Sequence, residues 1–310
     1  MKIAITGSSG YLADCLIPLL EMEPSIDEIV GIDIAEPKKR YSKLVFRKLS
    51  ILDTKQLEQV FSSVACVIHM AFDINGMHDK KLLERLNIGG SRSVMRAVAG
   101  SGKVKKLVFL SSIAAYGAHE DNPVPLREDS PLRGKGTFFY ADQKHRVEEE
   151  LDEFEKKYPE ISVVRLRLCT TTGPSAYNST VDLYTAPVFV AFPFHQPPVQ
   201  LLHEEDAARG IYLTIMKNVR GAFNLGSDWD FTAKEHARLA GTKIIIYLPV
   251  WLSKAIAYAL WWLRLIEFDP AWIQASLYPV VADISKAKEV LGWEPKFSSD
   301  QLATSLRETR

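Results

Sequence analysis

The residues best suited to catalysis are a tyrosine and a lysine four positions apart, Tyr140 and Lys144, in the run Tyr-Ala-Asp-Gln-Lys. On a helix, side chains with this spacing are neighbours, with about 5–6 Å between their Cβ atoms. A free phenol has a pKa of about 10, and an adjacent ammonium group favours the phenolate and lowers that pKa. Such a tyrosine can take a proton from a substrate hydroxyl, and Ser112 lies upstream as a second hydroxyl group. The pair therefore predicts proton-transfer chemistry if the fold brings the three side chains together.

Short apolar runs alternate with helical stretches through the first half of the chain, and these elements must position the three side chains. The apolar, β-branched runs cover residues 2–6, 28–33, 44–49, 65–69, 106–111 and 161–167. Helical stretches are expected near residues 11–22, 79–100 and 140–158. This alternation is typical of a parallel sheet whose continuous apolar strands are covered by helices on both faces. The sequence therefore predicts an α/β fold with a doubly wound parallel sheet of the Rossmann type.

A glycine turn joins the first expected strand to the first expected helix, in the run Thr6-Gly7-Ser8-Ser9-Gly10-Tyr11-Leu12-Ala13. Gly7 permits the tight turn, Gly10 lets the backbone approach a pyrophosphate, and the helix N-terminus favours the negative charge of that group. Asp33 ends the second strand, where its carboxylate can accept hydrogen bonds from the ribose hydroxyls of adenosine and would repel a 2′-phosphate. Although the basic residues 38–40 follow closely, this arrangement predicts NAD rather than NADP as the cofactor.

The alternation of strands and helices ends near residue 169, resumes in a return segment at about 203–228, and stops again from about residue 229. Trp, Tyr, Pro and helix-forming residues predominate beyond that point. We predict that residues 1–169, with the return segment, form an NAD-binding Rossmann domain. Residues 170–202 and 229–310 are predicted to form a second, smaller and mainly C-terminal domain that binds the substrate.

The composition is that of an ordinary globular protein and argues against several classes of partner. Of the 310 residues, 47% are hydrophobic, and the chain carries 38 basic and 38 acidic residues. Without a basic stripe or an arginine-rich tail, nucleic-acid binding is not expected. The three cysteines, Cys15, Cys66 and Cys169, lie far apart in apolar runs, which indicates reduced core residues rather than disulfides or a metal site. No signal peptide is recognised at the start, and a cytoplasmic location is expected.

Other conspicuous polar residues are expected to have structural roles. His69 at a strand end and His203 before a helix are predicted to be hydrogen-bonded structural histidines, and no spacing of Cys, His and Asp suggests a metal. Asp53 is expected to cap a helix that begins at Thr54. The acidic run 148–150 is expected on the exposed face of its helix.

Several motifs, taken in order, carry a resemblance to a known family. They are the glycine turn, Asp33, and residues 69–72, 87–91, 111–117, 140–144, 167–174, 203–207 and 283–295. With these motifs the chain resembles the extended short-chain dehydrogenase/reductases over nearly its whole length. Within them it is most similar to the NAD-dependent epimerase/dehydratase group, particularly UDP-glucose 4-epimerase-like proteins.

The resemblance implies roles for individual residues. Ser112, rather than Ser111, would hydrogen-bond the reacting oxygen. Tyr140 would act as base in oxidation and acid in reduction, while Lys144 would lower the tyrosine pKa and bind the nicotinamide ribose. The residues implied to bind NAD are Gly7, Ser9, Gly10, Tyr11, Leu12, Asp33, Ile34, Ser50, Ile51, Met70, Ala71, Phe72, Asn87, Tyr140 and Lys144. For Phe72, a place in the core is an equal alternative. A homodimer that pairs the helices at 79–100 and 140–158 is also implied.

The chain departs from the family pattern where nucleotide sugars are bound. Thr170 stands where many nucleotide-sugar epimerases have Asn, and Val199 stands where an arginine that grips a diphosphate is common. Losing this arginine removes a bidentate phosphate clamp. Ser50 replaces an acidic residue beside the adenine. The sequence therefore predicts hydride-transfer chemistry without identifying the substrate.

Three functions stay open. The first is epimerisation or elimination at a hydroxyl of a sugar or nucleotide sugar. The second is net oxidation or reduction of an apolar alcohol or ketone, as in the hydroxysteroid dehydrogenases of the same superfamily. The third is NAD binding without catalysis, against which the intact Ser112, Tyr140 and Lys144 argue.

The apolar run at residues 244–263 is the motive for the second function, because it could line an apolar pocket. It is expected to form a helix packed on the smaller domain's own core. Pro249 and Lys254 interrupt the run and argue against a membrane-spanning helix. Association with a membrane surface is the weaker alternative.

Overall fold

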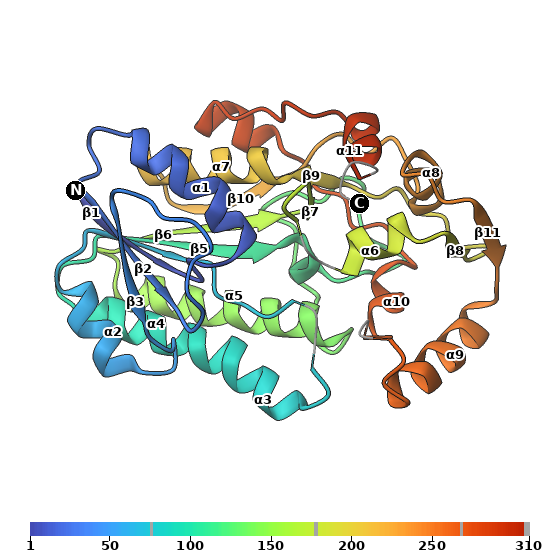
Figure 1. Cartoon of the computed structure of the whole chain (residues 1–310), viewed down its shortest axis with the longest axis horizontal. Coiled ribbons are helices and arrows are strands. Elements are labelled where there is room, and N and C mark those ends of the chain that lie inside the picture. Colours follow the sequence, from blue (N-terminus) through green and yellow to red (C-terminus); the bar gives the residue numbers. More distant parts are fainter. Residues whose placement is uncertain (75–76, 177–178, 267–268, 307–310) are drawn as a thin grey trace.

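A sheet of seven parallel strands forms the centre of the molecule, in the order β10-β6-β5-β4-β1-β2-β3 (Figure 1). The computed structural model describes residues 1–74, 77–176, 179–266 and 269–306. The strands are β1 (Lys2–Thr6), β2 (Glu28–Asp33), β3 (Leu44–Lys48), β4 (Cys66–His69), β5 (Lys106–Ser112), β6 (Ser162–Leu168) and β10 (Gly221–Leu225). The chain reverses its direction of winding between β1 and β4, and ligands of such sheets bind beyond the carboxyl ends of the strands at this point. The predicted doubly wound α/β fold is confirmed.

Helices cover both faces of this sheet (Figure 1). On one face lie α1 (Tyr11–Met22) and α7 (Glu204–Met216), and on the other lie α2 (Thr54–Phe61), α4 (Gly90–Gly100) and α5 (Phe139–Lys157). Alternate side chains of a strand point to opposite faces, so Ile3 and Ile5 belong to one core and Ala4 to the other. Both cores are therefore built from the apolar runs that the sequence shows.

The predicted helix at 79–100 is present in three consecutive pieces. α3 (Lys80–Glu84) leads into a π-helical turn, Arg85–Gly89, and then into α4. The predicted cap of α2 is also present, because the Asp53 carboxylate accepts a hydrogen bond from the backbone N–H of Gln56 at 3.1 Å. Local sequence signals thus placed the elements of this half of the chain correctly.

A smaller region gathers at the carboxyl ends of the strands, on the right of Figure 1. It contains two short strand pairs, β7 (Thr170–Thr172) with β9 (Leu201–His203) and β8 (Val188–Ala191) with β11 (Ile244–Tyr247). Its helices are α6 (Ser179–Thr185), α8 (Ala233–Leu239), α9 (Val250–Trp262), α10 (Trp272–Ala275) and α11 (Ser299–Ser305). Side chains of α6, β8, α8 and α11 share an apolar cluster separate from the two cores beside the sheet. This cluster closes the open end of the sheet.

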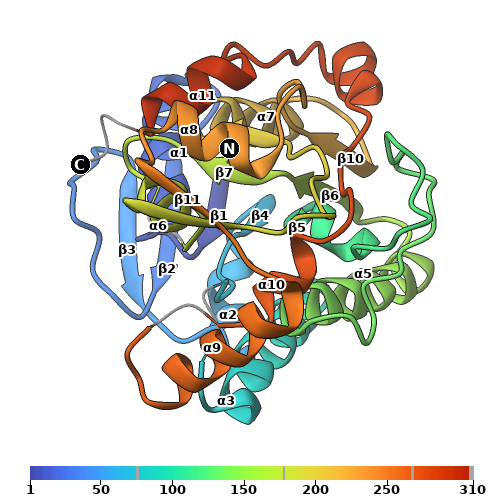
Figure 2. The same cartoon turned by 90° about the vertical axis from the view of Figure 1, so that its right-hand side faces the viewer.

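The apolar run 244–263 packs on this region as predicted, but only through part of its side chains, such as Ile245, Val250 and Ala257. Of the residues of α9, Ser253 alone is buried, while Trp251 and Trp262 are 70% and 79% exposed. Figure 2 shows α9 and β11 on the outside of this end of the molecule. A helix that is apolar on every side can bury only the side that meets a neighbour. Within the described residues no helix is long and apolar enough to cross a membrane.

Candidate active site

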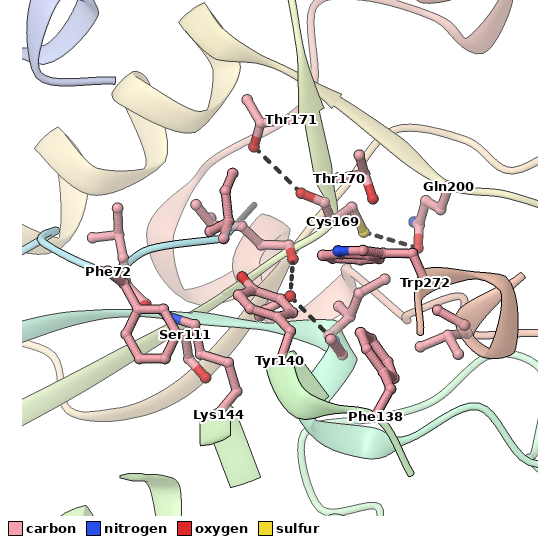
Figure 3. Close-up of a pocket in the computed structure, with 18 of the residues that line it drawn as sticks. Phe72, Ser111, Phe138, Tyr140, Lys144, Cys169, Thr170, Thr171, Gln200 and Trp272 are labelled. Carbon is pink, nitrogen blue, oxygen red and sulfur yellow. Dashed lines mark hydrogen bonds between the residues drawn. The ribbon is translucent and has the colours of Figure 1, made fainter. Parts of the chain in front are cut away.

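The three residues predicted to do chemistry meet in one pocket of about 450 Å³ at the carboxyl end of the sheet (Figure 3). Ser112 is the last residue of β5, and Tyr140 and Lys144 lie in the first two turns of α5. The pocket is lined by, among others, Gly7, Gly10, Tyr11, Leu12, Met70, Phe72, Ser111, Ser112, Phe138, Tyr140, Lys144, Thr170, Val199, Gln200, Trp272 and Tyr278. We call Ser112, Tyr140 and Lys144 the inner wall of this pocket.

Tyr140 lies in an aromatic surrounding. Its ring is 5.9 Å from the ring of Phe72, 6.4 Å from that of Phe138 and 5.3 Å from that of Trp272, measured between centroids. Burial raises the pKa of Tyr140 to about 12, while a hydrogen bond with the Ser112 side chain acts in the opposite direction. The phenol therefore holds its proton firmly in this arrangement.

Lys144 is buried and bound to the backbone rather than to the tyrosine. Its Nζ donates a hydrogen bond to the carbonyl oxygen of Leu110 at 2.7 Å and lies 3.6 Å from the ring centroid of Phe72. Burial lowers the pKa of Lys144 to about 7, and Glu148 partly offsets this. Burial and the Ser112 hydrogen bond set the direction of the Tyr140 pKa shift here, so the lowering of that pKa by Lys144 stays a prediction.

Ser112 was predicted, rather than Ser111, to hydrogen-bond the reacting oxygen, and the two hydroxyl groups have different partners. The Ser112 hydroxyl lies beside the main chain, 3.4 Å from the carbonyl oxygen of Leu168 and 3.2 Å from the backbone N–H of Ala114. The Ser111 hydroxyl instead donates to the Glu148 carboxylate at 2.6 Å. Ser111 is therefore held in a structural network, while Ser112 stays next to Tyr140.

Glu148 was expected on an exposed helix face, and that expectation is wrong. Its side chain is fully buried and pairs with Arg167 of β6 through two hydrogen bonds of 3.0 Å. Arg167 also donates to the hydroxyl of Tyr116 at 2.9 Å. Glu148 follows Tyr140 and Lys144 at successive four-residue steps, so it lies on the buried stripe of α5. That spacing was the signal that the sequence interpretation missed.

The glycine turn has the close backbone contact that its sequence predicts. Gly7 has φ of +76°, and a Cβ at this position would lie 2.7 Å from the backbone nitrogen of Ala71. The Asp33 carboxylate accepts hydrogen bonds from the backbone N–H groups of Ser9 at 3.1 Å and Ile34 at 2.7 Å. The turn, the N-terminus of α1 and the carboxylate at the end of β2 form a site that fits NAD.

The other residues predicted to bind NAD divide into two groups. Gly10, Tyr11, Leu12, Met70 and Phe72 line the pocket. Ser9, Asp33, Ile34, Ser50, Ile51, Ala71 and Asn87 are not among the described residues that line it.

Asn87 is buried behind the pocket, where it connects two segments. Its side chain exchanges hydrogen bonds with the backbone of Asp73, at 2.8 and 2.9 Å, and donates to the Gln143 side chain at 2.8 Å. It therefore fixes the loop after β4 against α5.

The two histidines have the structural roles predicted for them. His69 is held between the hydroxyls of Thr6 and Ser91, at 2.6 and 3.1 Å. Burial lowers its pKa to about 3, so the ring is neutral at physiological pH. His203 caps α7 by accepting a hydrogen bond from the backbone N–H of Glu205 at 3.2 Å.

Comparison with known proteins agrees with this geometry. The model of the family described as "NAD dependent epimerase/dehydratase family" matches residues 3–226. The chain belongs to this family. Membership makes it an NAD-dependent enzyme of the epimerase/dehydratase type and argues against the alternative of NAD binding without catalysis.

Individual relatives extend the likeness over the whole chain. A UDP-glucose 4-epimerase of Yersinia enterocolitica is 33% identical over 187 residues, which cover 56% of this chain and 54% of that enzyme. An uncharacterized protein of Mycobacterium tuberculosis is 25% identical over 308 residues, covering 96% of this chain and 81% of the relative. The crystal structure of a UDP-glucose 4-epimerase of Thermotoga maritima with UDP-glucose superposes with a TM-score of 0.78, at 22% identity, over 100% of this chain and 98% of that chain. At this identity the superposition shows the fold.

A second set of pocket residues, two of which contact the ring of Tyr140, is largely aromatic and apolar. We call Phe138, Val199, Trp272 and Tyr278 the outer wall. The indole ring of Trp272 lies 5.1 Å from the ring of Phe138, between centroids, and its buried Nε1 has no hydrogen-bond partner among the described residues. Trp272 and Tyr278 lie beyond the segment that the family model matches, and no sequence motif predicted that they line the pocket.

Proposed function

We propose that this enzyme acts on a hydroxyl group of a sugar or nucleotide sugar, with Tyr140 as the group that takes and returns the proton. The observation that carries the proposal is the convergence of Ser112, Tyr140 and Lys144 in the pocket that the glycine turn also borders. The family supports hydride transfer through NAD, and the UDP-glucose 4-epimerases among its relatives support the substrate class.

In the proposed mechanism each inner-wall residue has a separate task. The glycine turn and Asp33 would hold NAD, which would supply a reversible hydride acceptor for the substrate carbon. The Ser112 hydroxyl donates a hydrogen bond to the reacting oxygen and holds it next to the phenol. In reduction, the neutral phenol of Tyr140 donates its proton, which the raised pKa keeps in place.

In the oxidising direction the phenol must first ionise. The Ser112 hydrogen bond favours the anion, and the ammonium form of Lys144, whose Nζ lies 5.7 Å from the Tyr140 ring centroid, adds positive charge nearby. Because the pKa of Lys144 is about 7, this charge is present below neutral pH and is lost above it. Lys144 thus couples the proton transfer to pH.

The test is incubation of the purified enzyme and NAD with a series of UDP- and dTDP-hexoses. An epimerase interconverts two hexoses without accumulating NADH, which is monitored by its absorbance. A dehydratase releases water and gives a keto-deoxy sugar, again without NADH. Inertness of the NAD-loaded enzyme towards every nucleotide sugar contradicts the proposed substrate class.

A second candidate, net oxidation or reduction of an apolar alcohol or ketone, is favoured by the outer wall. Among the described residues that line the pocket, Lys144 is the one cation, and it is hydrogen-bonded to Leu110. Val199 leaves the outer wall without an arginine for a diphosphate. The same NADH absorbance assay, with apolar alcohols in place of the nucleotide sugars, separates the candidates, because net oxidation of an alcohol produces one NADH per turnover.

We also propose that the chain is organised as predicted, with an NAD-binding domain of residues 1–169 plus 203–228 and a smaller substrate domain of residues 170–202 and 229–310. A cytoplasmic location is also proposed.

The proposed homodimer forms through the surfaces of α3, α4 and α5. Within one chain, the ion pairs Arg92–Glu150 and Arg146–Glu84, of 2.6 and 2.7 Å, join these helices into one face that could meet a second copy. Sedimentation velocity at micromolar concentration tests the dimer, which a single monomer peak contradicts.

A further inference from the structure

Three aromatic side chains form an exposed stripe along α9. Trp251, Tyr258 and Trp262 are 70%, 49% and 79% exposed. Their spacings of seven and four residues place them within about 40° of one another around a helix of 3.6 residues per turn. We call these three residues the aromatic face of α9.

Further apolar side chains widen this surface. Ile256 and Leu263 flank the aromatic face and are 44% and 57% exposed, and Leu265 beyond the helix is 68% exposed. β11, which leads into α9, exposes Ile246 and Tyr247. A contiguous apolar surface of this kind marks an interaction site rather than scattered exposed residues.

The side of α9 next to the aromatic face is fixed to the protein, so the aromatic face has a defined orientation. Val250 and Ala257 pack on an apolar cluster that includes Ile273 of α10. The Trp261 ring stacks on His78, with 3.9 Å between centroids. Lys254 Nζ also donates to the Gln274 side chain of α10 at 2.8 Å. Figure 2 shows α9 on the outside of this end of the molecule, and the exposure of Trp251, Tyr258 and Trp262 shows that the aromatic face points to solvent.

The charge of the surrounding segment identifies the kind of partner. Residues 236–266 contain no Asp or Glu, although the whole chain carries equal numbers of acidic and basic residues. The same segment contains Arg238, Lys243, Lys254 and Arg264. Arg238, Lys243 and Arg264 are exposed. Lys243, which precedes β11, and Arg264, between Leu263 and Leu265, thus add positive charge next to the exposed apolar residues, with no acidic residue in the segment.

We propose that the aromatic face of α9 binds the surface of a bilayer that contains anionic phospholipids. Tryptophan and tyrosine favour the boundary between headgroups and acyl chains, and nearby basic side chains favour anionic headgroups. The 13 residues of α9 span about 20 Å, too short for the hydrocarbon core, so the helix lies in the plane of the surface. α10, which α9 contacts, carries Trp272 into the pocket, so the lipid surface lies one helix away from the active site.

The test is co-sedimentation of the full chain with phosphatidylcholine vesicles, with and without phosphatidylglycerol. The wild type is expected to bind the anionic vesicles and to bind the neutral ones more weakly. Trp251→Gln with Trp262→Gln is expected to reduce the partition coefficient at least roughly tenfold. Lys243→Gln with Arg264→Gln is expected to reduce it by roughly fivefold for each charge, on anionic vesicles only.

Matched controls separate this effect from a general loss of apolar surface. Met22→Gln with Val290→Gln changes two residues that are 81% and 45% exposed elsewhere, and vesicle binding should be unchanged. Thermal unfolding and NAD binding of all variants should equal those of the wild type, because the substituted side chains are exposed and outside the pocket. This readout keeps the test independent of the proposed reaction.

Three results overturn the proposal. In the first, the wild type stays in the supernatant when it is mixed with anionic vesicles. In the second, the double tryptophan variant binds these vesicles as well as the wild type does. In the third, the double tryptophan variant changes from dimer to monomer in sedimentation velocity while neither protein binds vesicles. That outcome assigns the aromatic face to contact between two copies of the chain.

Discussion

The inner and outer walls face the same pocket but are built differently. On the inner wall, Lys144 is hydrogen-bonded to the strand β5 and Ser112 lies against β6, at the end of a tightly packed sheet. On the outer wall, the rings of Phe138 and Trp272 contact each other and that of Tyr140, and Trp272 has an indole N–H without a partner among the described residues. Two of the three residues proposed for proton transfer are thus held by the sheet, whereas the outer-wall residues proposed to face the substrate are held by contacts between side chains.

The largest expected effect is loss of the inner-wall phenol. Tyr140→Phe should reduce turnover by roughly 10²–10⁴-fold, because no other described group of the pocket replaces the proton donor and acceptor. NAD binding, measured by fluorescence titration, should be retained. Tyr158→Phe, at the far end of α5, is the matched control and should leave turnover unchanged. Equal activity of Tyr140→Phe and wild type removes Tyr140 from the mechanism.

The second expected effect concerns the ion pair beneath the inner wall. Glu148→Gln should reduce the free energy of unfolding by about 3–5 kcal/mol, because it leaves the buried Arg167 guanidinium without its carboxylate. Urea unfolding measures this change. Glu149→Gln, one residue along on the exposed side of α5, should stay within about 0.5 kcal/mol of wild type. Similar midpoints for the two variants contradict the role of the buried pair.

The third expected effect is a dependence of stability on pH. The pKa of Lys144 is about 7 in the folded chain against 10.5 for the free group, so between these values the unfolded chain binds the extra proton. Stability should therefore rise with pH in this window, and the full cost of burying the charge should be present below about pH 7.

Lys144→Met tests this dependence. In urea unfolding without NAD, it should be more stable than wild type by a few kcal/mol near pH 6, and the advantage should shrink towards pH 10. A difference that is constant with pH contradicts a lowered pKa. Lys156→Met, at the C-terminal end of α5, is a control for the loss of an exposed lysine.

The smallest expected effect lies on the outer wall. Trp272→Phe keeps an aromatic ring but removes the unpartnered N–H, so KM for the substrate should rise roughly threefold to tenfold while kcat stays the same. Trp229→Phe, an exposed tryptophan outside the pocket, is the control. An unchanged KM for Trp272→Phe means that the indole N–H does not contact the substrate. A large fall in kcat would instead place Trp272 with the inner wall.

Much of the inner wall was predictable, because its signals are local. The four-residue step from Tyr140 to Lys144 specifies a shared helix face, and the glycine turn between an apolar strand and a helix specifies backbone geometry. The four-residue step from Lys144 to Glu148 indicated a shared helix face, but the partner Arg167 comes from a strand that follows α5, and only packing brings the pair together. The same packing removes water from Lys144 and Tyr140, so their pKa values depend on the folded structure.

The order of strands and helices, the family and the residues that meet at the end of the sheet could all be predicted from the sequence. These follow from periodicity and short motifs, which depend on neighbours in the chain. The folded structure was needed to see that Lys144 is hydrogen-bonded to Leu110, that Trp272 lines the pocket, and that α9 presents three aromatic side chains to solvent. The physical reason is that burial and desolvation depend on which distant segments cover a side chain, and no local pattern records that covering.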